Sequence, residues 1–253
     1  MNIGYVLGPA GSGKSHLTRA TYDWMNSLEY NVITMNLDPG VVRLPYAPDI
    51  DVRQFVDYND IVDRFELGPN GGLVVAMDQV AIKIDEILEE LHNYGPDYVL
   101  VDFPGQIETV AFRSSGAVII NELSRGNATS GLFLMDPTLS ATASSFISVL
   151  LFGISVSYRL RIPMNYIITK LDMIRQERLD RISEWANNPE FLQEDLRSEE
   201  FILSSEVSRQ IADIIINLDA LGDFPAVSCE TNENLELIFA IMQRNWNSED
   251  IFQ

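Results

Sequence analysis

Short runs of apolar residues alternate with segments of helical spacing along most of this chain. The runs are continuously apolar, which is typical of parallel strands buried on both faces. This alternation predicts an α/β fold, with a mostly parallel twisted sheet, helices on both faces and right-handed crossovers. The predicted strands span 2–7, 31–37, 97–101, 131–135, 164–169 and 225–228, and the predicted helices between them span 15–28, 72–92, 106–123, 138–157 and 172–186.

The region 38–71 interrupts the alternation inside what we expect to be one domain, 1–253. It is rich in Pro, Asp and Gly, and it separates the second strand from the next long helical pattern. Short helices are expected around 51–56 and 58–65.

A second interruption, 187–222, predicts a helical insertion or lid before the last strand. Its apolar residues recur at helical spacing and include Phe201, Ile202 and Leu203. The chain then returns to the sheet, and a final helix over 232–246 is expected to start at an Asn232 cap and pack on the sheet edge.

Composition limits the partners and the compartment. The chain carries 37 Asp and Glu against 17 Lys and Arg, a net charge of −20, so its surface repels nucleic acid and anionic membranes. The single cysteine, Cys229, excludes an internal disulfide framework and indicates a reducing compartment. We see no signal peptide before the first strand, and the apolar stretch 146–156 is too short to span a bilayer, so we expect a cytoplasmic protein.

The stretch between the first strand and the first helix, GPAGSGKS at 8–15, fits the phosphate-loop pattern G-x-x-x-x-G-K-[ST] at every required position. Glycines let successive backbone N–H groups cradle phosphate oxygens, and the helix N-terminus adds partial positive charge. Lys14 can reach the β- and γ-phosphates, and the Ser15 hydroxyl can bind Mg²⁺. A glycine-rich turn that binds nothing is the weaker interpretation in this strand–loop–helix context. The predicted phosphate-binding residues are Pro9, Ala10, Gly11, Ser12, Gly13, Lys14, Ser15 and His16.

Asp102 follows the third predicted strand, in the sequence DFPGQIE. Its carboxylate can hold Mg²⁺ directly or through water, and the Gly105 N–H can sense a γ-phosphate. Gln106 could orient an attacking water, with Glu108 close enough to join it. Alone, Asp102 is equally well explained as a helix cap after a strand; the phosphate loop earlier in the chain favours the metal site.

A base-reading element follows the fifth predicted strand, at Thr169-Lys170-Leu171-Asp172. It differs by one residue from the Asn-Lys-x-Asp element of GTPases. Asp172 can accept two hydrogen bonds from guanine N1–H and N2–H₂, a donor pair that adenine lacks, and the Lys170 stem can lie over the base. Thr169 stands where the usual element has Asn. The alternative is a helix start with Asp172 near its N-terminus.

Two weaker motifs complete the set. Val227-Ser228-Cys229 resembles the Ser-Ala-Lys element whose backbone N–H groups face guanine O6, although Ser-Cys after a strand is common turn chemistry. Gly68-Pro69-Asn70 would form a stiff loop tip that presents Asn70, and on physical grounds alone an ordinary turn is the favoured interpretation.

The ordered set GPAGSGKS, NLDPG, GPN, VDFPGQIE, TKLD and VSC resembles the GPN-loop GTPases, in the signal-recognition and nitrogenase-like branch of P-loop proteins. The resemblance covers nearly the whole chain, includes LPYAPDIDVR after the second strand, and is similar to archaeal members without a long C-terminal extension. Some relatives in that branch use a lysine near the start of the phosphate loop; here Pro9 stands there, so trans stabilisation by such a lysine is excluded.

The resemblance implies a Mg²⁺-dependent GTPase that works as a homodimeric nucleotide switch on unknown client proteins. Asn70 of one subunit would approach the γ-phosphate of the other in trans. Asp38 would position the catalytic water or the Mg²⁺ shell, Gln106 and Glu108 would complete the water network, and Lys14 would neutralise charge. The inserted helices would move with the nucleotide state.

Two other functions stay open at this point. One is a P-loop kinase for a small molecule, whose lid would close over an acceptor; such a kinase has no need of the TKLD element. The other is a nucleotide-bound scaffold with negligible turnover, because the groups that bind phosphate also catalyse its transfer.

Overall fold

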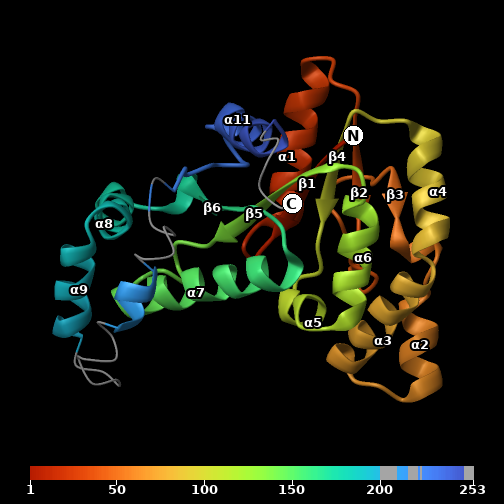
Figure 1. The fold of residues 1–253 in the computed structure, drawn as a ribbon, viewed down its shortest axis with the longest axis horizontal. Helices are drawn as coiled ribbons and strands as arrows, with labels where there is room; N and C mark the ends of the chain where they lie inside the picture. Colours follow the sequence, from red (N-terminus) through yellow and green to blue (C-terminus); the bar gives the residue numbers. More distant parts are fainter. Residues whose placement is uncertain (200–209, 216–221, 223, 248–253) are drawn as a thin grey trace.

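A six-stranded sheet forms the centre of the computed structural model, which describes residues 1–199, 210–215, 222 and 224–247 (Figure 1). Every strand pairing is parallel, in the order β3-β2-β4-β1-β5-β6, which confirms the predicted α/β fold. The central strand β1 pairs with β4 on one side and β5 on the other, so their carboxyl ends meet at one edge. The strands are β1 (Asn2–Leu7), β2 (Val32–Asn36), β3 (Ile50–Asp51), β4 (Tyr98–Asp102), β5 (Ala128–Met135) and β6 (Met164–Ile168).

Successive strand residues point to opposite faces of the sheet, which divides the core into two clusters. In β1, Tyr5 belongs to the larger cluster and Val6 to the smaller one. The smaller cluster is covered by α1 (Lys14–Ser27) and α11 (Leu235–Trp246), above the sheet in Figure 1. The larger cluster packs against the remaining helices: α2 (Tyr58–Phe65), α3 (Pro69–Ile82), α4 (Ile84–Tyr94), α5 (Ile107–Ala111), α6 (Ser114–Ser124), α7 (Ala143–Leu160), α8 (Gln176–Asn187) and α9 (Pro189–Ser198).

The predicted helix over 72–92 is wrong in its start and in its continuity. It is two helices, α3 and α4, which meet at Lys83. α3 starts at Pro69 with Gly68 as its N-cap, because the fixed φ angle of proline suits the first helical position. Asn70 therefore lies in the first turn of a helix and not at a loop tip.

The predicted helix over 106–123 is also divided, into α5 and α6. The chain is extended at Arg113 and then turns back, so that the two helices pack against each other. A Cβ atom added at Gly116 would lie 2.2 Å from the Val110 carbonyl oxygen. Only glycine lets the backbones approach this closely, a tertiary requirement that helical spacing does not reveal.

Four further features differ from the sequence prediction. The predicted strand over 225–228 forms two isolated bridges, Ala226 with Ile168 and Ser228 with Glu233, and the two-residue strand β3 was not predicted. α7 starts at Ala143, later than predicted, because the Thr142 hydroxyl accepts from Ser145 N and caps it there. Asn232 is not the cap of the last helix: α11 starts at Leu235, after Asn234.

The element after β6 and the described parts of the insertion are helical as predicted, with different bounds. A 3₁₀ turn, η2 (Leu171–Met173), precedes α8. Within the predicted insertion the structure describes α9 and a helical segment at 210–215, and α9 packs against α7 and α8. The predicted apolar positions Phe201, Ile202 and Leu203 lie outside the described residues.

Among the described residues, α7 is the one helix whose length and composition would allow it to cross a membrane, with a mean hydropathy of 1.4 over 18 residues. It is longer than the apolar stretch considered in the sequence. One side of it, including Phe146, Leu150 and Val156, is fully buried in the larger core cluster. This burial is typical of a core helix that covers a sheet.

The corner between α5 and α6 can be tested with Gly116→Ala. The added methyl group has a backbone carbonyl in its way, so the variant should lower the free energy of unfolding by about 1–3 kcal/mol in urea titrations. Gly222→Ala is the matched control, since nothing lies within 4 Å of its added Cβ. Equal stabilities for the two variants would contradict the packing described.

Candidate functional site

The loop between β1 and α1 has the backbone that the glycine pattern predicts. Gly8, Gly11 and Gly13 have φ angles of 146°, 76° and 96°, a region that other residues rarely adopt. A Cβ at Gly8 would also lie 2.9 Å from the Leu134 carbonyl oxygen. Gly13 leads directly into α1, so the loop ends at a helix N-terminus whose free N–H groups favour an anion.

Lys14 folds back onto this loop. Its Nζ donates to the carbonyl oxygens of Gly8 and Pro9, both at 2.9 Å, and the residue is 6% exposed. Burial lowers the pKa of the ammonium group, although the carboxylates of Asp102 and Asp38 oppose that shift. An ammonium held by two neutral carbonyls can exchange them for phosphate oxygens, which are stronger acceptors.

Asp102 closes β4, opposite Val6 of β1, and is buried beside the loop. Its Oδ2 accepts a hydrogen bond of 3.1 Å from the Tyr46 hydroxyl, while its Oδ1 has no hydrogen-bond partner among the described residues. Burial raises the pKa of Asp102 to about 6. A buried carboxylate oxygen without a partner, in a cavity that Ser15 also lines, fits a hard cation such as Mg²⁺.

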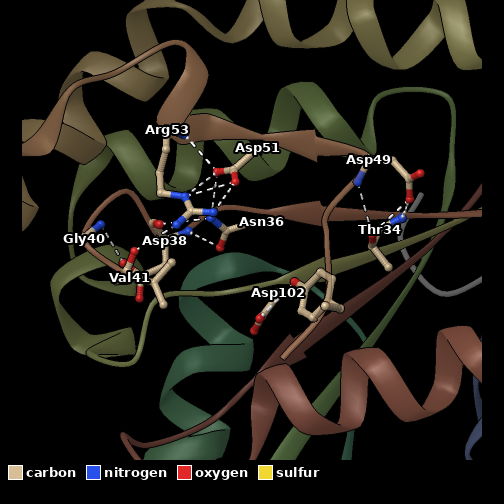
Figure 2. A network of polar contacts seen from close by, with 10 residues as sticks. Thr34, Asn36, Asp38, Gly40, Val41, Asp49, Asp51, Arg53 and Asp102 are labelled. Carbon is tan, nitrogen blue, oxygen red and sulfur yellow. Dashed lines mark hydrogen bonds and ion pairs between the residues drawn. The ribbon is translucent and has the colours of Figure 1, made fainter. Parts of the chain in front are cut away.

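Asp38 follows β2 and joins two loops. Its Oδ1 accepts from Gly40 N at 2.9 Å (Figure 2). Its Oδ2 accepts from Gly105 N at 3.3 Å. Burial raises the pKa of this carboxyl group too. The Gly105 N–H that the sequence assigned to a γ-phosphate is therefore bound to Asp38 in this structure.

Thr169 connects the two ends of the site. Its hydroxyl donates to the Ser12 carbonyl oxygen at 2.8 Å, and both residues are buried. The hydroxyl is thus engaged by the phosphate loop. This bond fixes the element after β6 against the loop after β1, although β5 lies between the two strands.

Lys170 pairs with an acidic residue that the sequence interpretation missed. Its Nζ lies 2.6 Å from Oδ2 of Asp136, which follows β5 and also accepts from Thr138 N at 2.8 Å. Although burial opposes it, these partners hold the pKa of Asp136 below its usual range. A signal was available, because the fourth apolar run ends in Asp as the third does.

Asp172 is exposed and lines the cavity, and its carboxylate is hydrogen-bonded to Ser228. The Ser228 hydroxyl donates to Asp172 Oδ1 at 2.6 Å and accepts from Glu230 N and Thr231 N at 3.3 and 3.2 Å. Since two N–H donors occupy the hydroxyl oxygen, its single proton is directed to the carboxylate. Burial raises the pKa of the neighbouring Cys229 to about 11, so this thiol is a weak nucleophile at neutral pH.

A cavity of about 580 Å³ joins these groups. The segment after β2 also contributes to its wall, with Val41, Arg43, Leu44 and Pro45, none of which was predicted as a site residue. The predicted site residues that line it are Gly11, Gly13, Lys14, Ser15, His16, Asp38, Asp102, Gly105, Thr169, Lys170, Asp172 and Cys229.

Other predicted site residues lie outside the cavity wall. Gln106 caps α5 with its Oε1 buried and without a partner among the described residues, and Glu108 is exposed on the first turn of that helix. Asn70 is exposed at the start of α3, and no residue of α2 or α3 lines the cavity. Their catalytic roles remain predictions.

Comparison with known proteins places this chain in a family. A family model described as "Conserved hypothetical ATP binding protein" matches residues 6–247. GPN-loop GTPase 1 of Dictyostelium discoideum is 32% identical over 196 residues, which are 77% of this chain and 49% of that protein. GPN-loop GTPase 2 of Danio rerio is 33% identical over 172 residues, 68% of this chain and 55% of that protein. The chain belongs to the GPN-loop GTPase family.

A solved structure agrees over almost the full length. The apo form of a GTPase from Pyrococcus abyssi superimposes with a TM-score of 0.85 at 26% identity and covers 98% of both chains. By contrast, the chain spans about half the length of the two curated GPN-loop relatives named above. The resemblance inferred from the motifs is therefore confirmed for family and fold.

The residues present suit a cation that is bound together with phosphate. No group of three or more His, Cys, Asp or Glu that could hold a metal occurs among the described residues. Mg²⁺ does not need one, because it is usually held by one or two carboxylates, phosphates and water. The orphaned Oδ1 of Asp102 and the Ser15 hydroxyl are the protein groups placed to contribute.

The raised pKa of Asp102 predicts how metal binding depends on pH. Only the carboxylate binds a cation, so Mg²⁺ affinity of the nucleotide-bound protein should be constant above the pKa of about 6 and fall about tenfold per pH unit below it. This affinity can be measured by following how fast a bound fluorescent GDP analogue is released as Mg²⁺ is added, at several pH values from 7.5 to 5. Titrations of the free analogue correct for protonation of its phosphates, and a corrected Mg²⁺ affinity unchanged at pH 5 would contradict the assignment.

Proposed function

We propose that this protein binds GTP with Mg²⁺ and hydrolyses it to GDP and phosphate. The observation that carries this proposal is the carboxylate of Asp172, held by Ser228, in the same cavity as the phosphate loop. The cavity offers one end for a triphosphate and another for a base with two adjacent N–H donors. The names of the relatives and of the Pyrococcus abyssi protein support the same activity.

At the phosphate end, this chain supplies charge and fixed donors. Lys14 would leave the carbonyl oxygens of Gly8 and Pro9 and move to the β- and γ-phosphates. Ser15 and Asp102 would hold Mg²⁺, which when bound neutralises charge on the phosphate oxygens. Asp38 and Gln106 would orient the attacking water; Gln106 directly follows Gly105, whose N–H donates to Asp38.

The contact between Asp38 and Gly105 offers a way for the γ-phosphate to act as a switch. The Gly105 N–H cannot be directed at both the Asp38 carboxylate and a γ-phosphate, so GTP would release Asp38 from this 3.3 Å contact. The chain after β2 would then differ between the GTP and GDP states. Gly105 leads into α5, which packs against α7, and Glu199 at the end of α9 accepts from Ala143 N at the start of α7 at 2.7 Å, so the insertion would respond through these contacts.

At the base end, Asp172 distinguishes guanine from adenine. The carboxylate can accept from N1–H and N2–H₂ of guanine, whereas adenine has no such pair of donors and would leave these two hydrogen bonds unmade, at a cost of about 1–3 kcal/mol. The family model's description mentions ATP, so base preference is a direct test of this assignment.

Asp172→Asn should exchange the base preference. An amide can donate to the C2 carbonyl of xanthine, so the variant should release phosphate from XTP and lose about tenfold or more on GTP. The wild-type protein should prefer GTP to both ATP and XTP in the same phosphate-release assay, without any added acceptor. Lys14→Ala, which should be inactive on all three, is the control for contaminating phosphatases. Equal wild-type turnover of ATP and GTP would overturn the guanine assignment.

We also propose that the active form is a homodimer in which Asn70 acts on the partner's nucleotide. In its own chain Asn70 is exposed and does not line the cavity. Its position is fixed, because the Tyr58 hydroxyl of α2 donates to the Pro69 carbonyl oxygen at 3.1 Å. An exposed side chain on a backbone that is held in this way suits a role in a second subunit. Client proteins and a cytoplasmic location remain predictions from the sequence.

Action in trans can be tested by mixing two inactive variants. In a dimer of Asn70→Ala with Lys14→Ala, one site has both an intact phosphate loop and an intact Asn70 from the other subunit. Co-expressed variants should therefore recover about a quarter of wild-type turnover, although each alone is nearly inactive. If both variants fold and pair but no activity returns, Asn70 does not act across the dimer.

A further inference from the structure

A strap of irregular chain, residues 39–49, runs from β2 to β3 along the nucleotide cavity. Four of its residues, from Val41 to Pro45, line that cavity. The sequence PGVVRLPYAPD has three prolines and no helical spacing, and the strap forms neither a helix nor a strand. What fixes it must come from the residues at its ends.

The start of the strap is held by a network around Arg53 (Figure 2). The Arg53 guanidinium donates to the Val41 carbonyl oxygen at 3.1 Å, and its Nε donates to Asp51 Oδ1 at 2.9 Å. The same Asp51 oxygen accepts from Asn36 Nδ2 at 3.0 Å, and that amide also donates to the Asp38 carbonyl oxygen. These bonds join the strap to β2 and to the turn after β3.

The end of the strap is held separately, at Asp49. Its carboxylate accepts from the backbone N of Thr34 at 2.8 Å and from the Thr34 hydroxyl at 3.0 Å. The Tyr94 hydroxyl, at the end of α4, donates to the Asp49 carbonyl oxygen at 3.0 Å. With both ends fixed, the middle of the strap has a defined position over the edge of the sheet.

Tyr46 lies in that middle part, and its hydroxyl donates to Oδ2 of Asp102 at 3.1 Å. Asp102 is 1% exposed, and its other oxygen, Oδ1, is buried without a partner among the described residues. A carboxylate with one oxygen bound and the other free can rotate less than one with both free. The oxygen left over is the one that can meet a cation.

We propose that Tyr46 is a positioning residue for the metal: its hydrogen bond to Oδ2 fixes the Asp102 carboxylate so that Oδ1 is directed at Mg²⁺. This inference rests on the proposed function and adds a residue to it. Partners that orient a metal-binding carboxylate in this way raise metal affinity by about 10–100-fold in other proteins. Because the strap also lines the cavity, a change in its conformation would thereby change metal binding.

Tyr46→Phe tests this, because it removes the hydroxyl and keeps the ring. The Mg²⁺ concentration that half-protects a bound fluorescent GDP analogue from release should rise about tenfold, while its affinity in EDTA should stay as in the wild type. Mn²⁺ binding to the GDP complex, followed by electron paramagnetic resonance, should weaken by a similar factor. Thermal unfolding in EDTA confirms that the variant is folded.

Tyr94→Phe is the matched control, since it removes a hydroxyl that holds the same strap but does not touch Asp102. It should shift the Mg²⁺ requirement far less than Tyr46→Phe does, because the Asp49 carboxylate keeps its bonds to Thr34 and still holds that end of the strap. An unshifted requirement in Tyr46→Phe, or an equal shift in Tyr94→Phe, would overturn the proposal while GDP binding by the wild type stands. A wild-type protein that bound no guanine nucleotide, with or without Mg²⁺, would overturn the proposed function and this inference together.

Discussion

The hydrogen bond from the Thr169 hydroxyl to the Ser12 carbonyl oxygen joins the two halves of the pocket. It links chain segments 157 positions apart, across the end of a strand that separates them. Because both partners are buried, neither can turn to water if the bond breaks, and an unpaired buried group costs about 1–3 kcal/mol. The phosphate loop and the base-reading element therefore keep a fixed separation, which a pocket for one whole nucleotide requires.

Charge is concentrated at the same edge of the sheet. Burial moves the pKa of Lys14 down and those of Asp38 and Asp102 up, so in all three groups the protein disfavours the charged form. Such arrangements are typical of functional sites, because they lower stability unless a ligand compensates them. When a triphosphate and its cation bind, the negative phosphates would stabilise the charged form of Lys14, and the cation would stabilise the charged forms of the two carboxyl groups.

Two features could be predicted from the sequence because each follows a regular pattern: the strands of the sheet and the nucleotide pocket. The parallel strands were recognisable from continuous apolar runs, and the pocket from glycines and charged residues at strand ends. The sequence did not predict features that depend on tertiary contacts: α5 and α6 are separate helices that pack closely where Gly116 meets Val110, and Tyr46 reaches Asp102 from a segment without any periodicity. Asp136 could have been found, since it ends an apolar strand in the same way as Asp102.

The central claim is that loops from separate strands form one guanine-nucleotide site, and hydrogen–deuterium exchange tests it most directly. On addition of GDP and Mg²⁺, the account predicts slower amide exchange together in residues 8–17, 169–173 and 228–231, and no such change at 169–173 or 228–231 with ADP. Protection confined to the phosphate loop, or equal protection by ADP in all three segments, would contradict it.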